Sequence, residues 1–583
     1  MALVFFGFLL VGLNWIVGFW IYDVSLLPRL LALMVFLAFA LPLCARPAVW
    51  KKFDFGILGN PVIAFFGLYA LLTAFSLLFA INPTAGFNDL FRTIGAFVVL
   101  CLSCLILSTT PHWPVLLVRV VSVAAFGACA IGYYQMFSKF GFGLPTRTEA
   151  EAVTGLMSNV NLFAGFLNLL LPFCFCGIFI QRGWWRLTAA LCGFATILLI
   201  VLLQSRAAYI GLGVAFFVSV VPVVFLGENL GFSLSRRGLV FGVVAVFSMI
   251  AAATIAIATD NPIGDRVRTI FTGDFSRIDG GRLMVWGLTL EMIRDHFLSG
   301  VGAGNFTIRM HEYLGRPGRD FSSILTNWAQ PHNDFLWVLA EKGVFGFLVF
   351  MALFAAAFFS GLAALRTGVK RDQAWMTVFA LAGLAAYATA SCFDFPLERI
   401  NQQVYFAVLL SILVVARHPW KESRCVVCWP FRLAATLAFA MLVGGTIYAV
   451  AAIRQEYHVN LARRAIRQQD YDQAILQARL AATDWKTLDP VATPVAFLEG
   501  YANWKSGHTE EAVHLLQLAR EANPNRLYVL QSLGAVYLEL GCTKEAIECL
   551  NLAVQRYPNE VEPKLLLEKA LASQAAPAHD FFH

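Results

Sequence analysis

The chain has 583 residues, of which 59% are hydrophobic and only 14% are charged, and its formal net charge is +7. Since soluble globular proteins carry roughly 25% charged residues, this composition excludes a soluble enzyme and indicates a membrane protein. Lys and Arg lie mostly in short connectors between apolar runs, so we attribute the positive charge to membrane topology and exclude a nucleic-acid partner.

Apolar segments long enough to cross a bilayer follow one another from the N-terminus to residue 453. The predicted fold is therefore all-α: a polytopic bundle of about 12–13 transmembrane helices over residues 1–453, followed by a soluble helical domain over 454–583. Met1 to Tyr22 lacks the basic start of a signal peptide, so we expect it to be the first retained span. The predicted spans are approximately 3–22, 25–44, 61–80, 92–109, 114–137, 161–180, 186–204, 207–226, 238–259, 333–363, 374–392, 402–416 and 432–453.

Basic residues occupy alternate connectors, which predicts the orientation of the bundle. The basic connectors lie around residues 46–52, 182–186, 236–237, 366–371 and 417–424. By the positive-inside rule these connectors are cytoplasmic. The remaining loops then face outward, including 138–160, the turn at Arg206, the long loop 260–332 and everything after residue 453.

The polar C-terminal segment repeats itself with a period of 34 residues. Gly507, Ala512, Pro524 and Asn525 recur as Gly541, Ala546, Pro558 and Asn559. This period resembles the tetratricopeptide repeat, whose stacked helix pairs present a surface to a peptide or protein. We therefore expect 454–583 to be an outward-facing module that binds a protein partner.

The outward loop 260–332 contains eight arginines, no lysine and eight acidic residues. Arginine binds phosphate oxygens through two parallel N–H donors and keeps its charge. The use of arginine instead of lysine in this loop therefore favours phosphate binding. The alternative is that most of these arginines pair with acidic residues inside a folded loop.

Two arginines are distinguished by their positions. Arg206 lies where two apolar spans meet with almost no connector, at the outer membrane boundary, where a cation needs a wet cavity, an anion or the headgroups. Arg282 follows two glycines and opens a predicted helix over 283–297, whose Trp286, Leu290, Ile293 and Phe297 would dock on the bundle or the membrane. An ion pair with Asp279 is the alternative for Arg282.

His332 lies at the outer mouth of the span that begins near Phe335. An imidazole at a membrane cavity suits a proton acceptor, although a lone histidine can equally be a hydrogen-bonded interfacial residue. Cys425 and Cys428 form a CxxC without a second pair, and no His/carboxylate set has metal-ligand spacing. We therefore expect no metal and no cofactor.

Several short motifs occur in a characteristic order outside the membrane. The chain resembles the O-antigen ligase and O-antigen polymerase family of bacterial envelope glycosyltransferases over roughly residues 150–350. The residues that carry this resemblance are Gly155 to Gly165, Ser205-Arg206, Gly281-Arg282 with Trp286, Gly300 to Phe306, Pro331-His332-Asn333, and Glu341 to Gly346.

The resemblance implies a metal-independent, GT-C-like transferase of the bacterial inner membrane, with its repeats in the periplasm. Its donor would be a glycan on undecaprenyl diphosphate, and its acceptor the lipid A core, a growing glycan or a protein. Carried over by position, Arg206 and Arg282 would hold the diphosphate, and His332 would accept the proton of the acceptor hydroxyl. Asn333 would orient the acceptor, and Asn159 and Asn161 would line the cavity.

Other functions remain open at this point. Within the same class, the chain could be a polysaccharide polymerase or a protein O-oligosaccharyltransferase. A transporter or flippase for lipid-linked sugar would need its polar residues near the bilayer midplane, whereas here they gather at one face. An assembly scaffold with an inert membrane part is the third class.

Overall fold

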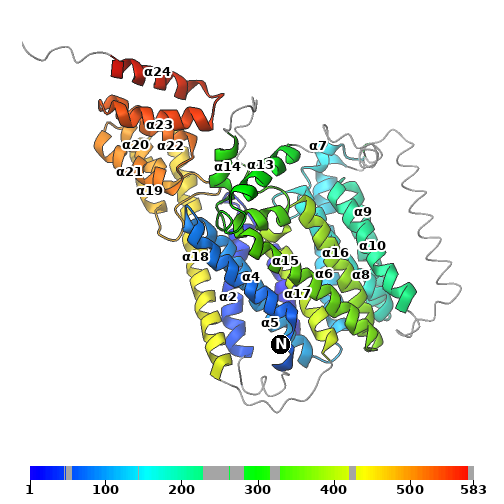
Figure 1. Ribbon diagram of the computed structural model, residues 1–583. Coiled ribbons are helices and arrows are strands. Elements are labelled where there is room, and N and C mark those ends of the chain that lie inside the picture. The colour runs from blue at the N-terminus through cyan, green and yellow to red at the C-terminus, as the bar shows by residue number, and fades with distance from the viewer. Residues whose placement is uncertain are drawn as a thin grey trace, which may run out of the picture.

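Eleven helices among the described residues are long and apolar enough to cross a membrane, and they pack as one bundle (Figure 1). The computed structural model of the protein describes residues 1–44, 46, 55–141, 144–226, 262, 281–314, 328–418 and 429–575. Over these residues it contains one isolated β-bridge and no strand, which confirms the all-α prediction. The membrane helices are α2 (Leu26–Cys44), α4 (Pro61–Ser76) extended by η3 (Leu77–Phe79), α5 (Phe87–Thr109), α6 (Trp113–Phe140), α8 (Val160–Ile180), α9 (Trp184–Leu202), α10 (Arg206–Leu226), α15 (Asp334–Arg366), α16 (Arg371–Phe393), α17 (Ile400–Arg417) and α18 (Trp429–Arg467).

The core of the bundle surrounds α17. Every residue of this helix from Ile400 to Ala416 is buried, and α5, α15 and α16 pack against it. A helix that is apolar on all sides is expected in such a central place. α18 lies on one flank against α2, whereas α10 lies on the other against α16 (Figure 1).

The first predicted span is wrong in its length. Residues 3–22 do not form one helix: α1 (Ala2–Leu10) and the short 3-10 helix η1 (Gly12–Trp15) end at Trp15. The buried side chain of Arg29 donates hydrogen bonds to the carbonyls of Asn14 and Ile16, which a continuing helix would need for its own ladder. The predicted span 238–259 lies outside the described residues.

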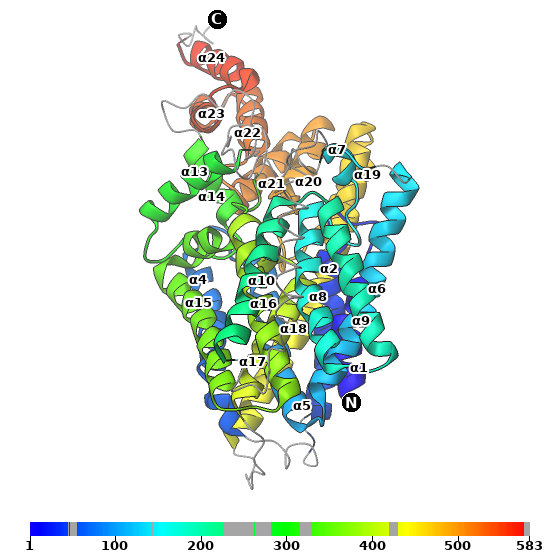
Figure 2. The ribbon, with the colours of Figure 1, turned by 90° about the vertical axis from the view of Figure 1, so that its right-hand side faces the viewer.

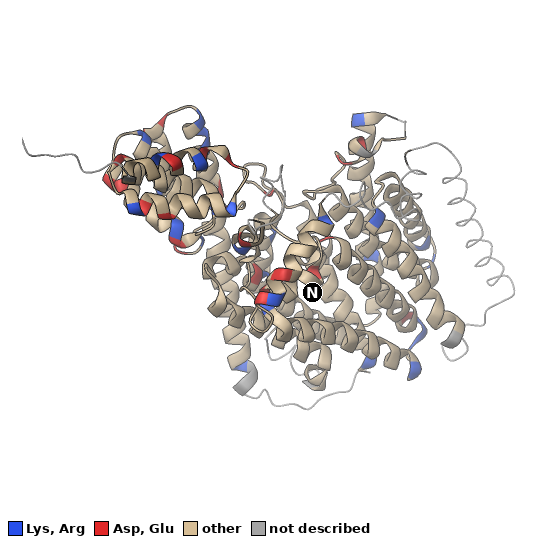
Figure 3. Ribbon diagram, turned by 45° about the horizontal axis from the view of Figure 1, so that its top comes forward, with Lys and Arg blue, Asp and Glu red and all other residues tan. Residues whose placement is uncertain are grey.

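The connectors separate into two groups at the two ends of the bundle. At one end, polar contacts link Asp23 to Arg399 and Asn82 to Thr487 of the repeats, and we name this the repeat-bearing end (Figure 2). The basic connectors that the structure describes, such as 181–186 and 366–371, belong to the opposite end. Charged residues are scarce along the bundle helices and frequent on the repeats (Figure 3).

The repeats follow the last membrane helix without a linker, because α18 continues unbroken from the bundle into the first helix pair. The remaining helices are α19 (Tyr471–Ala481), α20 (Val495–Lys505), α21 (Thr509–Ala522), α22 (Leu527–Glu539), α23 (Thr543–Arg556) and α24 (Val561–Ala575). Gly507 and Gly541, one period apart, both adopt positive φ between the helices of a pair. Ala512 and Ala546, also one period apart, are both fully buried, as helix pairs that stack closely require.

Candidate functional site

His332 lies at the repeat-bearing end, directly before α15. Its backbone is in the left-handed region at φ 53°, which costs a side-chain-bearing residue roughly 1–2 kcal/mol and often marks a functional position. Its Nδ1 lies 3.6 Å from Oδ1 of Asp394, within ion-pair range but too far for a hydrogen bond. The ring packs edge-on against Phe395, and the side chain keeps 22% of its exposure. Phe395 therefore fixes the orientation of the His332 imidazole close to the Asp394 carboxylate, and part of the side chain stays accessible to a substrate.

The two residues after His332 hold it in place. The Asn333 side chain caps α15 by accepting from the backbone N–H of Leu336 at 3.0 Å, and it donates to the Cys392 carbonyl at 3.1 Å. Asp334 is fully buried and accepts hydrogen bonds from the Ser391 hydroxyl and from the backbone N–H of Leu397. Both side chains bind the last turn of α16, and Asp334 also binds the loop after it, the loop that carries Asp394.

Arg282 is brought to the same place by α13 (Arg282–Asp295). One turn after Arg282, the Trp286 indole N–H donates to the carbonyl of Pro331 at 2.8 Å. Gly281 adopts φ 86°, and a Cβ there would lie 3.1 Å from the Trp328 ring, so glycine allows the close approach. Residues one turn apart share a helix face, so Arg282 lies on the face of α13 that carries the contact with Pro331.

The predicted docking face of this helix packs against the protein only in part. Of the four residues in the predicted stripe, Ile293 is buried, Trp286 is half-buried, and Leu290 and Phe297 are exposed. The buried face is instead Val285, Leu288 and Met292, because α14 (Phe306–Leu314) and α15 pack on that side.

Arg206 opens α10 at the same end of the bundle. The residue two before it, Gln204, adopts φ 54°, so a second left-handed residue stands beside a predicted site residue. α10 packs against both α8 and α16 near this end, and Asn168 of α8 donates to the Ala208 carbonyl of α10 at 2.9 Å. Because α16 leads into Asp394, Arg206 is on a helix that adjoins the His332 region.

Asn159 and Asn161 begin α8 at this end. Asn159 caps the helix by accepting from the backbone N–H of Asn161 at 2.7 Å, and both side chains are half-buried. The segment before them is fixed by Arg29, which donates to the Leu156 carbonyl at 2.7 Å. The predicted residues Arg206, Arg282, His332, Asn333, Asn159 and Asn161 therefore all lie at the repeat-bearing end. Their elements are linked through α16, because α8, α10 and α15 each pack against α16 and α13 packs against α15.

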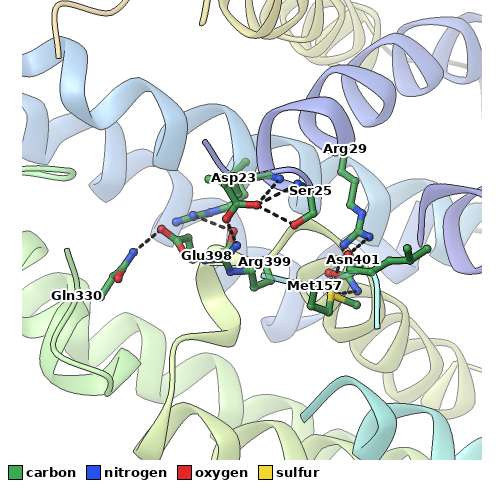
Figure 4. Close-up of polar contacts among 11 residues, drawn as sticks. Asp23, Ser25, Arg29, Met157, Gln330, Glu398, Arg399 and Asn401 are labelled. Atoms are coloured by element: carbon green, nitrogen blue, oxygen red, sulfur yellow. Dashed lines mark hydrogen bonds and ion pairs between the residues drawn. The ribbon is translucent and has the colours of Figure 1, made fainter. Parts of the chain in front are cut away.

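A row of charged side chains beside His332 was missed by the sequence analysis. Gln330 donates to Glu398 at 2.5 Å, Glu398 pairs with Arg399, and Arg399 pairs with Asp23 (Figure 4). Burial raises the pKa of Asp23, but the Arg399 guanidinium outweighs it and holds that pKa below its ordinary value. The only sequence signal for this row was Asp-Phe-Pro-Leu-Glu-Arg at 394–399, a charged connector between two apolar spans.

The glycine-rich motif after α13, Gly300 to Phe306, packs between the backbone of α15 and the backbone of residues 80–86. Val301 and Gly302 donate hydrogen bonds to the carbonyls of Ala340 and Glu341, both at 2.9 Å. A Cβ on Gly302 would lie 2.6 Å from Ala80, and one on Gly304 would lie 2.3 Å from the Ala85 carbonyl oxygen. Both glycines also have positive φ. The motif is thus a tightly packed structural joint.

The repeats contact this joint through Asn82 and α14. Asn82 exchanges hydrogen bonds with the buried amide of Asn305, and its Nδ2 donates to Thr487 and to the Ala522 carbonyl of the repeats. Asn525 donates to the Ile308 carbonyl at 3.0 Å and to Glu312 at 2.8 Å, both on α14.

The other side of α14 faces the segment that leads to His332. The Thr307 hydroxyl donates to the carbonyl of Ala329, three residues before His332, at 3.1 Å. The repeats are therefore connected to the predicted catalytic segment through one short helix.

We expect Asn525→Ala to loosen this contact. It removes one donor from the Ile308 carbonyl and one from Glu312, which keeps its ion pair with Arg309, so we expect a cost of about 0.5–1.5 kcal/mol. The matched control is Asn559→Ala, the same repeat position one period later, which is exposed. Hydrogen exchange in residues 306–314 should rise in Asn525→Ala and stay unchanged in Asn559→Ala. Equal protection in both variants would contradict the coupling.

Comparison with known families adds evidence on identity. Residues 191–351 match the family model Wzy_C, described as O-Antigen ligase. This segment is similar to the O-antigen ligase domain. The predicted family is thereby confirmed, and the matched segment includes Arg206, Arg282 and His332. The chain is thus a multi-pass membrane protein with a domain of the ligase and polymerase type of membrane glycosyltransferase.

Other comparisons add little to this assignment. No curated protein matches the chain. Among solved structures, it is similar to "Crystal structure of APC/C hetero-tetramer Cut9-Hcn1", with 14% identity over 82% of this chain and 92% of that chain. The TM-score is 0.20, so this likeness carries no argument about the fold. The described residues contain no group of three or more His, Cys, Asp or Glu side chains placed to hold a metal ion.

Proposed function

We propose that the protein transfers a glycan from an undecaprenyl-diphosphate carrier to an acceptor hydroxyl at its repeat-bearing end, which faces the periplasm of a bacterial inner membrane. The observation that carries the proposal is His332, strained and paired with Asp394 beside the helix that Arg282 opens. All three lie on elements at one end of a domain whose family transfers glycans.

The chemistry requires one base and a site for an anion. The acceptor oxygen bonds to the anomeric carbon of the glycan while the bond from that carbon to the diphosphate oxygen breaks. His332 takes the proton of the acceptor hydroxyl, and Asp394 stabilises the imidazolium that results. The undecaprenyl diphosphate leaves with its negative charge.

The arginines supply the anion site. Arg206 and Arg282 bind the diphosphate oxygens, and their donors stabilise the charge that grows on the leaving group. Asn161 and Asn159 line the cavity beside Arg206. Asn333 orients the acceptor indirectly, because its side chain already binds the backbone at Leu336 and Cys392.

Lysine substitutions test the anion site. Arg206→Lys and Arg282→Lys keep the charge but lose the paired donors, so we expect most transfer activity and donor affinity to be lost. The matched control is Arg294→Lys, an exposed arginine later on α13, which should behave as wild type. The measurement is binding and transfer of a polyprenyl-diphosphate glycan by purified protein. Full activity in both site variants would refute the assignment.

The orientation is tested by reporter fusions. A fusion after Arg371 should report a cytoplasmic location, and one after Asn460 a periplasmic location, because basic connectors stay inside. A cytoplasmic signal after Asn460 would place the site on the wrong side for this donor.

The acceptor is tested in cells by deleting the gene. Accumulated carrier-linked full-length glycan indicates a ligase onto the lipid A core. Loss of long chains with intact single repeats indicates a polymerase, and altered mobility of a glycoprotein indicates a protein O-oligosaccharyltransferase. Lipid-linked sugar trapped on the cytoplasmic side would instead support a flippase.

A further inference from the structure

Arg399 lies in the connector between α16 and α17, shortly after Asp394. Its side chain is only 7% exposed, so it can act on the site only through its neighbours. One end of its guanidinium pairs with Asp23 before α2, and the other end pairs with Glu398 at 2.5 Å (Figure 4). Asp23 is fixed in turn, because its Oδ1 accepts hydrogen bonds from the hydroxyl and the backbone N–H of Ser25 at 2.9 and 3.0 Å. Two carboxylates therefore hold the guanidinium in one place.

Two routes connect this guanidinium to His332. In the first, the central carbon of the guanidinium lies over the Phe395 ring, 5.3 Å from its centroid, and that ring packs edge-on against the His332 ring at 4.9 Å. In the second, Glu398 accepts a hydrogen bond from Gln330, two residues before His332. The ring beside the imidazole and the chain that leads into it are thus both attached to Arg399.

The His332 imidazole depends on such support because no strong direct contact orients it. Its Nδ1 has no hydrogen-bond partner among the described residues, and Asp394 at 3.6 Å is too far for one. Its ring contacts are with the rings of Trp328 and Phe395. Its backbone, at φ 53°, is in a conformation that the surrounding structure must impose. The orientation of the imidazole therefore follows from how its neighbours are packed.

We propose that Arg399 is a positioning residue for glycan transfer. Anchored by Asp23, it holds the Phe395 ring against His332 and holds Glu398 where it binds Gln330. Through these two contacts it keeps the imidazole beside Asp394 and directed at the acceptor hydroxyl. This inference rests on the proposed function, because Arg399 acts only through His332.

The test is steady-state transfer of a polyprenyl-diphosphate glycan by the purified full chain. Arg399→Gln should lower kcat by up to roughly 100-fold, as a displaced base does, and leave the KM for the donor unchanged. Arg399→Lys keeps the charge but reaches only one of the two carboxylates, so its kcat should lie between those of Arg399→Gln and wild type. Phe395→Leu removes the ring without changing any charge, and it should lower kcat in the same way. It keeps the proposal testable even if Arg399→Gln does not fold.

A double variant separates positioning from general destabilisation. If Arg399 acts through Phe395, the loss of kcat in the double variant should be smaller than the product of the two single losses, whereas independent effects would multiply. The matched control is Arg463→Gln, which removes an ion pair with Asp489 inside the repeats at the same end of the protein. It should keep the kcat of wild type.

Wild-type kcat in Phe395→Leu, or an equal fall of kcat in Arg463→Gln, would overturn the proposal. A raised donor KM with normal kcat in Arg399→Gln would also overturn it, since Arg399 would then serve donor binding. Failure of the proposed function is read from a different variant. Normal transfer by His332→Ala would refute the base itself, whereas an inactive His332→Ala beside fully active Arg399→Gln and Phe395→Leu would refute only the role of Arg399.

Discussion

Replacing His332 with alanine should lower glycan transfer by roughly 10²–10⁴-fold, the usual contribution of a general base. Donor binding should remain close to that of wild type, because the diphosphate is assigned to Arg206 and Arg282. Transfer and donor binding can be separated because their residues lie on different elements. His332 lies 3.6 Å from Asp394 before α15, whereas the two arginines open α10 and α13.

The control is His296→Ala, a half-buried histidine that ends α13 at the repeat-bearing end. It should leave transfer unchanged. Asp394→Asn should have an intermediate effect and shift the pH profile of transfer, because the neutral amide no longer stabilises the imidazolium. Near-normal transfer by purified His332→Ala would rule out the base, and Asp334 or Glu341 would then be the next residues to test.

Much of the bundle could be predicted because hydropathy and length identify a membrane helix locally. α8 (Val160–Ile180) and α10 (Arg206–Leu226), for example, begin and end within one residue of their predictions. The N-terminal span failed because its end depends on Arg29, a partner that the local sequence does not reveal. Nor does the sequence indicate that the Arg29 side chain, within the predicted span 25–44, is buried.

The predicted site residues were found by residue type and membrane boundary, and the structure places them at one end. Asp394 was missed because it is 62 positions after His332 in a short connector with no motif of its own. The partnership of Asp394 with His332 follows from the packing of α15 against α16, which is tertiary information. The connection between Asn525 and α14 required the same kind of information.

Gly343 lies against Gly300 of the glycine-rich motif, and its close neighbours support a further prediction. Gly343 interrupts α15 with φ 64°, and a Cβ there would lie 2.2 Å from the carbonyl oxygen of Leu298. The two other nearest atoms are also backbone, so no side-chain rotation can relieve the overlap. The kink brings Val344 N–H to the Phe297 carbonyl at 2.9 Å and thereby joins α15 to the end of α13.

Gly343→Ala should therefore destabilise the protein by more than about 3 kcal/mol, the upper end of the range for most substitutions. The matched control is Gly368→Ala, which has a similar φ of 76° but no atom within 4 Å of the added Cβ. That control should lose only the conformational cost of about 1–2 kcal/mol. The measurement is the unfolding temperature of each variant in detergent, with proteolysis of the outer segment as a second readout. We expect wild type to unfold highest, Gly368→Ala slightly lower and Gly343→Ala far below both. Similar unfolding temperatures for the two variants would show that backbone conformation alone, and not the contact with Leu298, accounts for the glycine.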